Sequence, residues 1–238
     1  MTTVTNLMAT LQIYSNSGVT KTKDSLNREQ MEIKTLQAIN LSCVRQYKTL
    51  FSDFSFSVSS GELLLIEGEN GAGKSSLLRL LASLATPITG DVTWQGESIY
   101  QSQTDYRSEL HYVGHANGLK LGLTVAENLK LINYLSSATI KNTDSILQSL
   151  QLFKEKNKQA SHLSAGQKRR LALAKLFLFP KQIWIVDEPL TALDLASQEF
   201  FLHALTSHLK QGGIAVISSH HAISLSTIKM HTLRLTAC

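Results

Sequence analysis

The 238-residue sequence has few cysteines and no long apolar run. Its two cysteines, Cys43 and Cys238, form neither a CxxC pair nor a metal-binding spacing, which argues against a disulfide framework and fits a reducing, cytoplasmic location. No stretch reaches the roughly 20 apolar residues of a membrane-spanning helix, and the Thr/Ser/Asn-rich N-terminus does not resemble a signal peptide. We therefore expect that the protein, if it acts at a membrane, docks on another subunit.

Charged side chains make up 17% of the residues and hydrophobic residues 43%, a composition that fits an ordinary globular protein. The net charge of +5 is compatible with a basic soluble surface, a nucleic-acid surface or a face near anionic lipid, and charge alone does not choose among them.

Residues 1–30 are polar and weakly periodic, so a disordered tail is expected there, with a native start at Met31 as the alternative. Residues 31–238 are expected to form one folded domain.

From Ile33 onward, apolar residues follow strand and helix periods in turn. Alternating or continuous apolar segments predict strands at 33–44, 54–60, 63–67, 182–186 and 214–218. Helical patterns predict helices at 74–84, 171–178 and 197–209, and a helical lobe at about 124–175. This order predicts an α/β fold in which helices surround a parallel sheet and a helical lobe is inserted.

A phosphate-binding loop follows the strand expected at 63–67. The segment Gly68-Glu69-Asn70-Gly71-Ala72-Gly73-Lys74-Ser75-Ser76 fits GxxxxGK[ST] and opens a helix. Glycines allow a tight turn that aims backbone N–H groups inward, and the helix N-terminus adds partial positive charge. Lys74 can reach the β- and γ-phosphates of ATP, and the Ser75 hydroxyl can bind Mg²⁺. ATP and Mg²⁺ are therefore the expected cofactors.

Two carboxylates stand at the end of the strand expected at 182–186. Ligands of open α/β sheets bind at the carboxyl ends of strands. Asp187 is therefore placed to contact Mg²⁺, and Glu188 is placed to act as the general base on water. A solvated strand-to-turn transition is the alternative, and the upstream phosphate loop weighs against it.

The segment Leu163-Ser164-Ala165-Gly166-Gln167 precedes a basic helix. Ser164 and Gly166 can offer a hydroxyl and a close-approaching N–H group to a phosphate, aided by the helix dipole. Ser164 can equally serve as a helix N-cap, and the two roles are compatible. The segment resembles the LSGGQ signature of ABC transporter ATP-binding domains, with Ala165 at the first glycine.

Two later segments also resemble motifs of this family. Thr191–Asp194 is similar to the D-loop, and His220 is similar to the switch histidine that contacts the γ-phosphate. Surface solvation is the alternative for a lone histidine, and His221 is expected to be a neighbour without a chemical role. The resemblance runs from about Met31 to the C-terminus.

The resemblance implies a P-loop NTPase fold of the ABC type, with an antiparallel β subdomain and a helical lobe. It also implies a homodimer that holds two ATP molecules, because in this family the signature segment of one copy closes on the phosphate loop of the other. Lys74, Glu188 and His220 then carry the catalysis.

Three segments narrow the resemblance to the ATP-binding subunits of cytochrome c maturation haem exporters. These segments are 49–84, Val92–Gly96 and Tyr112–Gly118. In most ABC ATPases a glutamine occupies the Q-loop position of His115, and a Gly-His pair is typical of the haem-exporter subunits. The resemblance implies an integral membrane permease as partner and a peripheral location on the cytoplasmic face of the inner membrane. Nucleic-acid binding is not expected. Direct haem binding is not expected either, since the sequence has no CxxCH motif.

The adenine contact departs from the family pattern. Counting back from Phe56, the position of the usual stacking aromatic falls on Arg45, and Tyr47 stands two residues away. An arginine plane or a tyrosine ring can cover a purine, so both residues remain candidates.

Other functions remain as alternatives. The ATPase of a lipoprotein, drug or peptide transporter is one, although the Gly-His pair and Trp94 favour the haem-exporter group. A soluble ABC protein of translation or DNA repair is another, but those proteins usually carry two ATPase domains or a long coiled-coil insertion. A binding module with a dead site is the third, and the intact set of Lys74, Asp187, Glu188 and His220 weighs against it.

Overall fold

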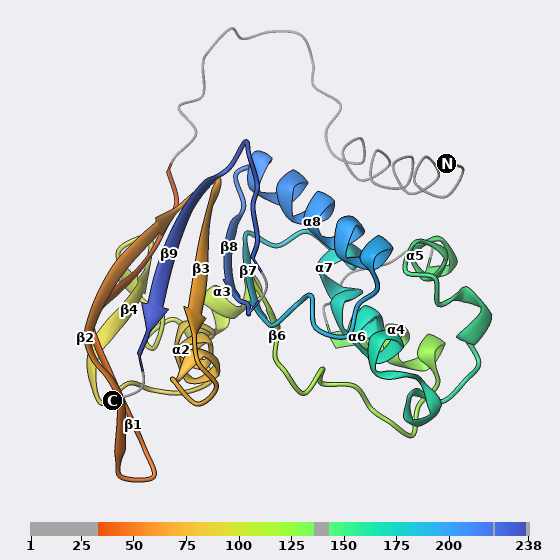
Figure 1. Cartoon of the computed structure of the whole chain (residues 1–238), viewed down its shortest axis with the longest axis horizontal. Coiled ribbons are helices and arrows are strands. Elements are labelled where there is room, and N and C mark those ends of the chain that lie inside the picture. Colours follow the sequence, from red (N-terminus) through yellow and green to blue (C-terminus); the bar gives the residue numbers. More distant parts are fainter. Residues whose placement is uncertain (1–32, 136–142, 221, 237–238) are drawn as a thin grey trace, which may run out of the picture.

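The computed structural model describes residues 33–135, 143–220 and 222–236. Figure 1 shows an antiparallel sheet, a parallel sheet and a group of helices, arranged side by side. The tail predicted at 1–30 and the prediction for His221 lie outside the described residues. The domain boundaries at 31–238 and the lobe limits at 124–175 stay predictions.

The antiparallel sheet has the strand order β2-β1-β4-β5. Its strands are β1 (Thr35–Arg45), β2 (Lys48–Ser59), β4 (Thr89–Trp94) and β5 (Glu97–Ser98). Gln46 and Tyr47 form the two-residue turn between β1 and β2, and both have positive φ, at 51° and 62°. Such a turn matches the right-handed twist of paired strands. The strands predicted at 33–44 and 54–60 are confirmed, and the second begins earlier than predicted.

The parallel sheet has the order β6-β7-β8-β3-β9. Its strands are β3 (Glu62–Gly68), β6 (Leu110–Val113), β7 (Ile183–Asp187), β8 (Ile214–Ser218) and β9 (Lys229–Leu235). All neighbouring pairs run parallel. Continuous apolar runs fit this arrangement, because β7 and β8 are buried along their whole length, with helices or a second sheet against each face.

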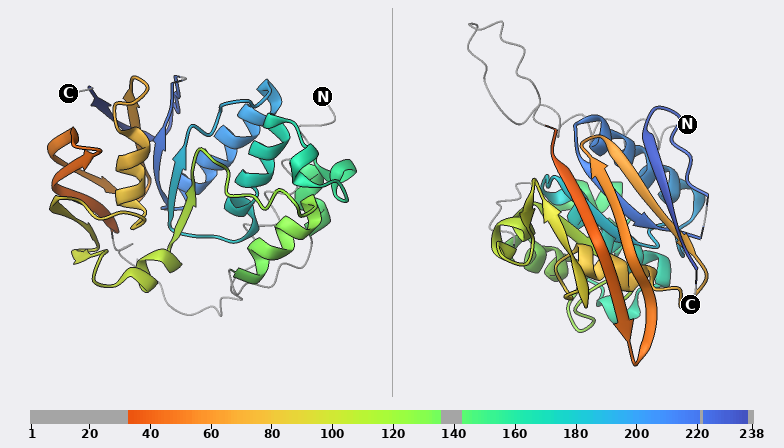
Figure 2. Two further views of the ribbon diagram at one scale, coloured as in Figure 1. Left: turned by 90° about the horizontal axis from the view of Figure 1, so that it is seen from below. Right: turned by 90° about the vertical axis from the view of Figure 1, so that its left-hand side faces the viewer.

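The two faces of the parallel sheet belong to two different cores. Leu64, Ile185 and Val216 pack with α2 (Lys74–Leu81) and the antiparallel sheet. Leu65 and Val186 pack on the other face, against α6 (Ala165–Leu173), α7 (Lys175–Leu178) and α8 (Leu195–Lys210). The alternation of side chains along a strand therefore separates α2 from α6–α8, and Figure 2 shows them on opposite sides of the sheet.

The helical lobe has an apolar core of its own. It contains α4 (Val125–Leu135), α5 (Thr143–Ser149) and two short 3-10 turns, at Phe153–Glu155 and Ala160–His162. Leu171 and Ala174 join this core to the helices on the sheet. Within the described ranges, no helix combines the length and apolarity needed to cross a membrane.

One helix prediction needs correction. A single helix was predicted at 171–178, but α6 begins at Ala165 and ends at Leu173, and α7 follows after Ala174. The earlier start has a physical reason in the cap at Ser164, described below. The helix α3 (Gln103–Ser108) was not predicted. Its sequence QTDYRS carries only one buried residue, Tyr106, and so lacks an apolar period.

Burial of a histidine makes the fold sensitive to acid. His111 on β6 is buried, its ring packs against Phe179, and its Nε2 lies 3.0 Å from the Phe179 carbonyl oxygen. Burial lowers the pKa of His111 to about 3, so the unfolded chain binds this proton more readily than the folded chain.

We predict that the free energy of unfolding falls as pH decreases from about 6.5 towards 4, with a contribution of about 3 kcal/mol from His111. Urea unfolding between pH 7.5 and 4.5 measures this slope. His111→Gln, which keeps a hydrogen-bond donor without a titrating group, should flatten the slope, and the exposed His203→Gln should not. An unchanged slope in His111→Gln contradicts the assignment.

Candidate active site

Parallel pairing brings three motifs to one edge of the sheet. The strands β3, β7 and β8 end at Gly68, Asp187 and Ser218. In the register of the sheet, Ser218 lies opposite Ile66 on one side and Asp187 on the other. The phosphate loop, the acidic pair and the histidine segment therefore leave the sheet at adjacent points.

The phosphate loop depends on glycine at two places. Gly68 has a φ of 149°, and a Cβ there would lie 2.4 Å from the carbonyl oxygen of Leu235 on β9. Gly73 has a φ of 100° and caps α2, and a Cβ there would lie 3.2 Å from Leu50. Only glycine adopts these conformations without strain, and both positions are in the predicted loop. Glu69, Asn70 and Ser75 are exposed along it.

The Lys74 ammonium lies inside the loop. Its Nζ donates to the carbonyl oxygens of Gly68 at 2.7 Å and Glu69 at 3.2 Å, and it lies 3.0 Å from His220 Nε2. The side chain is buried, so the positive charge is fixed at the start of α2. Backbone N–H groups, a helix N-terminus and a lysine at one place form an anion site.

His220 connects the phosphate loop to Glu188. Its Nε2 lies 2.9 Å from Asn70 Oδ1 and 3.4 Å from Glu188 Oε1, and its backbone N–H donates to Glu188 Oε2 at 3.2 Å. Glu188 Oε1 is buried without a hydrogen bond. A buried carboxylate oxygen without a donor can accept a proton from a water molecule, which is the chemistry of a general base.

Asp187 is buried beside Glu188 and is held by a serine. Ser218 Oγ donates to Asp187 Oδ1 at 2.6 Å. Asp187 and the Ser75 hydroxyl are hard oxygen donors of the kind that Mg²⁺ prefers. The described residues contain no group of three or more His, Cys, Asp or Glu that could hold a metal alone. The chemistry of the Asp187 carboxylate and the Ser75 hydroxyl fits Mg²⁺.

A buried arginine holds the ends of β6 and β7 together. Arg169 Nη1 donates to the Gly114 carbonyl at 3.1 Å and to Asn117 Oδ1 at 2.9 Å, and Nη2 donates to the Asp187 carbonyl. Burial lowers the pKa of Arg169 to about 10, while the charges of Asp187 and Glu188 oppose that shift. The guanidinium therefore stays charged at neutral pH and fixes the loop after β6 to the acidic strand.

The signature segment forms the start of α6. Ser164 Oγ accepts from the Gln167 N–H at 3.2 Å, and the Ser164 N–H donates to Gln167 Oε1 at 2.9 Å, which completes a capping box. Leu163 is buried as an anchor, whereas Ser164 and Ala165 are exposed. A Cβ on Gly166 would lie 2.5 Å from the Ala192 carbonyl oxygen. The capping role of Ser164 is present, and its hydroxyl also lies at the surface.

The D-loop residue Asp194 caps the next helix. Its Oδ1 accepts from the Ser197 N–H at 2.8 Å at the start of α8, and its Oδ2 lies 4.0 Å from Arg170 Nη1. The hydrogen bonds from Ser197 lower the pKa of Asp194. The close approach of Gly166 to Ala192 brings Leu163–Gln167 and the segment that resembles the D-loop, Thr191–Asp194, together.

Three predicted residues stand apart from this cluster. His115 is exposed on the loop after β6 and makes no hydrogen bond with another described residue. Arg45 and Tyr47 lie at the tip of the β1–β2 hairpin, where Tyr47 is fully exposed. The neighbouring part of β2 does reach the phosphate loop, since Leu50 and Phe51 line Gly73.

Sequence reasoning missed Arg169 and Ser218. Arg169 stands in the basic run KRR, which looks like a solvated helix start. Its helical spacing was the available signal, because Arg169 lies four residues before the buried Leu173 and so shares its face. Ser218 reads as an ordinary end of an apolar strand, and only the sheet register places it between Asp187 and Ile66.

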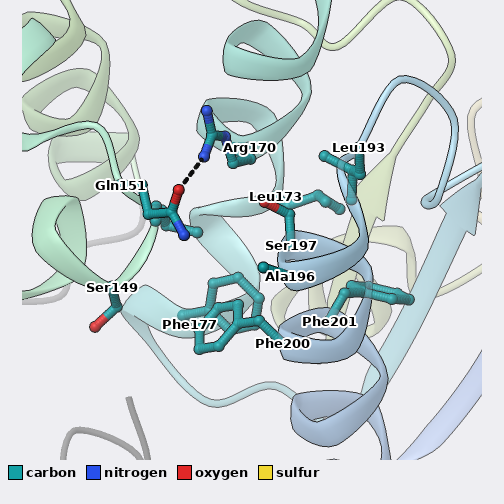
Figure 3. A pocket seen from close by; sticks show the side chains of 11 residues that line it. Ser149, Gln151, Arg170, Leu173, Phe177, Leu193, Ala196, Ser197, Phe200 and Phe201 are labelled. Carbon is teal, nitrogen blue, oxygen red and sulfur yellow. Dashed lines mark hydrogen bonds between the residues drawn. The ribbon is translucent and has the colours of Figure 1, made fainter. Parts of the chain in front are cut away.

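A narrow cavity lies between the helical lobe and the helices that pack on the parallel sheet. Figure 3 shows Phe177, Phe200 and Phe201 lining it, with Arg170 Nη1 hydrogen-bonded to Gln151 Oε1 at 3.1 Å. Its lining is mostly apolar and includes none of the loop, acidic or histidine residues of the cluster. The cavity belongs to the packing between α5 and α8.

Comparison with known proteins agrees with this geometry. Residues 51–191 match the family model described as ABC transporter. A solved ABC transporter ATP-binding protein from Pyrococcus furiosus has the same fold, with a TM-score of 0.70, 24% identity, and 84% and 97% of the two chains covered. The chain therefore belongs to the ABC transporter family as an ATP-binding domain, which confirms the predicted fold class.

The comparison also reaches a particular group of relatives. The chain is 40% identical over 202 residues to the cytochrome c biogenesis ATP-binding export protein CcmA of Dechloromonas aromatica, covering 84% of this chain and 99% of the relative. It is 41% identical over 206 residues to the CcmA protein of Nitrosomonas europaea, covering 86% and 97%. Both confirm the predicted resemblance.

The close approach of Gly166 to Ala192 gives a prediction for the signature segment. Gly166→Ala should lower the melting temperature, because the new methyl group meets a backbone carbonyl, at a cost of about 1–3 kcal/mol that exceeds the gain in helix propensity. Thermal unfolding measures the change. The control is Ala165→Gly, an exposed neighbour whose change should cost less than about 1 kcal/mol. Equal melting temperatures for Gly166→Ala and wild type contradict the prediction.

Proposed function

We propose that this chain is the ATP-binding and ATP-hydrolysing subunit of an ABC transporter complex that acts in cytochrome c maturation. The observation that carries the proposal is the meeting of Lys74, Glu188 and His220 at the carboxyl edge of the parallel sheet. The similarity to CcmA proteins supports the process, and the ABC family supports hydrolysis of ATP.

The phosphate loop binds the substrate. Backbone N–H groups of Gly68–Ser76 and the ammonium of Lys74 bind the β- and γ-phosphates. When ATP binds, the Lys74 ammonium exchanges its hydrogen bonds to the Gly68 and Glu69 carbonyls for hydrogen bonds to phosphate oxygens, so its charge stays paired. Ser75 and Asp187 would hold Mg²⁺, which would neutralise phosphate charge when bound.

Hydrolysis uses the residues beyond β7 and β8. Glu188 Oε1 takes a proton from the attacking water, whose oxygen forms a bond to the γ-phosphorus while the bond to the β-phosphate oxygen breaks. His220 contacts the γ-phosphate and holds the water. The Glu188 carboxylate accepts a hydrogen bond from the backbone N–H group of His220 and so fixes the position of His220. ADP and phosphate are the products.

The division of the sheet faces supports a homodimer. In one chain, α2 packs on one face and α6 on the other, so the helix that follows the phosphate loop and the helix that follows the signature segment Leu163–Gln167 lie on opposite faces of the sheet. A second copy can supply Ser164 and Gly166 in trans, and Asp194 can contact that copy through the D-loop. Two ATP molecules are then held between two chains.

A membrane permease of the cytochrome c maturation complex is the proposed partner. The chain then lies peripherally at the cytoplasmic face of the inner membrane, and His115 on the exposed loop after β6 faces the permease. Hydrolysis drives haem export or the release of a loaded haem chaperone. We assign to this chain neither nucleic acid nor haem as a direct ligand. The alternative is the ATPase of another ABC transporter, for lipoprotein, drug or peptide.

Substitution of the proposed base tests the function. Glu188→Gln should reduce ATP hydrolysis by at least about 100-fold, because a neutral amide cannot accept the proton. ATP should still bind, so the variant should run as a dimer with ATP and Mg²⁺ in size-exclusion chromatography. Glu199→Gln on α8, which changes the same charge at an exposed position, is the control and should hydrolyse ATP as the wild type does. Equal hydrolysis by wild type and Glu188→Gln rules out Glu188 as the base.

The adenine contact has its own test. Arg45→Ala and Tyr47→Ala should differ in their effect on ATP affinity, because only the residue that covers the purine contributes about 1–3 kcal/mol of stacking. Binding of ATP by isothermal titration calorimetry to each variant measures the difference. If neither variant changes the affinity, the adenine contact lies elsewhere.

A further inference from the structure

A buried serine contacts both residues of the acidic pair. Ser218 is the last residue of β8 and has no exposed surface. It stands in the middle of the sheet edge, since Ile66 and Asp187 are its register neighbours on the two sides. An apolar residue would fit the core pattern of β8, in which the preceding four residues are Ile214, Ala215, Val216 and Ile217.

The hydroxyl of Ser218 donates one hydrogen bond and accepts another. Its single hydrogen is donated to Asp187 Oδ1 at 2.6 Å, and its oxygen accepts from the Glu188 N–H at 3.0 Å. The Ser218 carbonyl oxygen lies 3.1 Å from the same N–H. One side chain therefore orients the carboxylate of Asp187 and the backbone of Glu188 at once.

The backbone of Glu188 needs such support. Its φ is 50°, in the left-handed region that a side chain other than glycine enters at a cost of about 1 kcal/mol. This conformation turns the chain away from β7 immediately after Asp187 and directs Glu188 towards His220. The contacts to Ser218 hold the turned N–H group in place.

We propose that Ser218 is a positioning residue that sets the geometry of Asp187 for Mg²⁺ and of Glu188 for the attacking water. The proposal rests on the function proposed above. A packing role depends only on the volume of the side chain, whereas a positioning role depends on the hydroxyl. Threonine and valine have nearly the same volume and shape, and only threonine has the hydroxyl, so they separate the two roles.

The test compares Ser218→Thr with Ser218→Val in the full chain. Both add the same bulk to the core, but Ser218→Val also leaves the buried Asp187 Oδ1 without its donor, so its melting temperature should be lower than that of Ser218→Thr, and both readouts are taken well below either melting temperature. The first readout is kcat and KM for ATP with Mg²⁺. The second is the affinity for a fluorescent ATP analogue with Mg²⁺ and with EDTA, which reports metal-assisted binding without hydrolysis.

Ser218→Val should lower kcat by about 10-fold or more relative to Ser218→Thr, as expected for the loss of a hydrogen bond to a charged group. It should also lose most of the gain in affinity that Mg²⁺ gives, while both variants bind the analogue equally in EDTA. Ser218→Ala removes the hydroxyl without added bulk and should match Ser218→Val, which keeps the test valid if a branched variant does not fold.

Equal kcat and equal Mg²⁺-dependent affinity in the threonine and valine variants, or a Ser218→Ala variant that behaves as wild type, overturn the role of Ser218. Those outcomes leave the proposed function intact, because the wild type still hydrolyses ATP. A wild-type chain that neither binds the analogue nor hydrolyses ATP overturns the proposed function and the role of Ser218 together.

Discussion

The parallel pairing of β3, β8 and β7 is the constraint on which the site depends. Their register fixes where Gly68, Ser218 and Asp187 leave the sheet. Segments separated by more than 100 residues of sequence thereby meet within hydrogen-bond distance, as Lys74 and His220 do at 3.0 Å. Full burial of β7 and β8 keeps this register, because a slip by one residue would turn apolar side chains to the opposite face.

The parallel sheet also lies between α2, which follows the phosphate loop, and α6, which follows the signature segment. Alternate side chains face α2 on one side and α6–α8 on the other, so each face has its own core. The proposed function assigns the exposed Ser164 at the start of α6 to the phosphate loop of a second copy, which is part of the proposed catalytic unit. Arg169 adds a direct link within the chain, since its guanidinium binds the loop after β6 and the backbone of Asp187. The same guanidinium thus holds that loop and the acidic strand.

Short sequence patterns predicted most of the strands and helices of the fold. The runs LLLIE, QIWIV and IAVIS were predicted as buried strands, and β3, β7 and β8 confirm them within one or two residues. The helix break at Ala174 was not predicted, because the apolar period continues through it. The phosphate loop and the acidic pair were candidates from local patterns with a known chemistry, and His220 was a candidate from the resemblance to the ABC family. Their roles in catalysis remain predictions.

The sequence by itself determined which residue types were available and in what local conformation, because glycine spacing, capping residues and apolar periods act over a few residues. It did not determine which strands are neighbours. The placement of β9 beside β3, the contact of Gly68 with Leu235 and the contact of Ser218 with Asp187 exist only in the tertiary structure. The physical reason is that strand pairing joins residues far apart in the chain, and a strand carries no local mark of its partner.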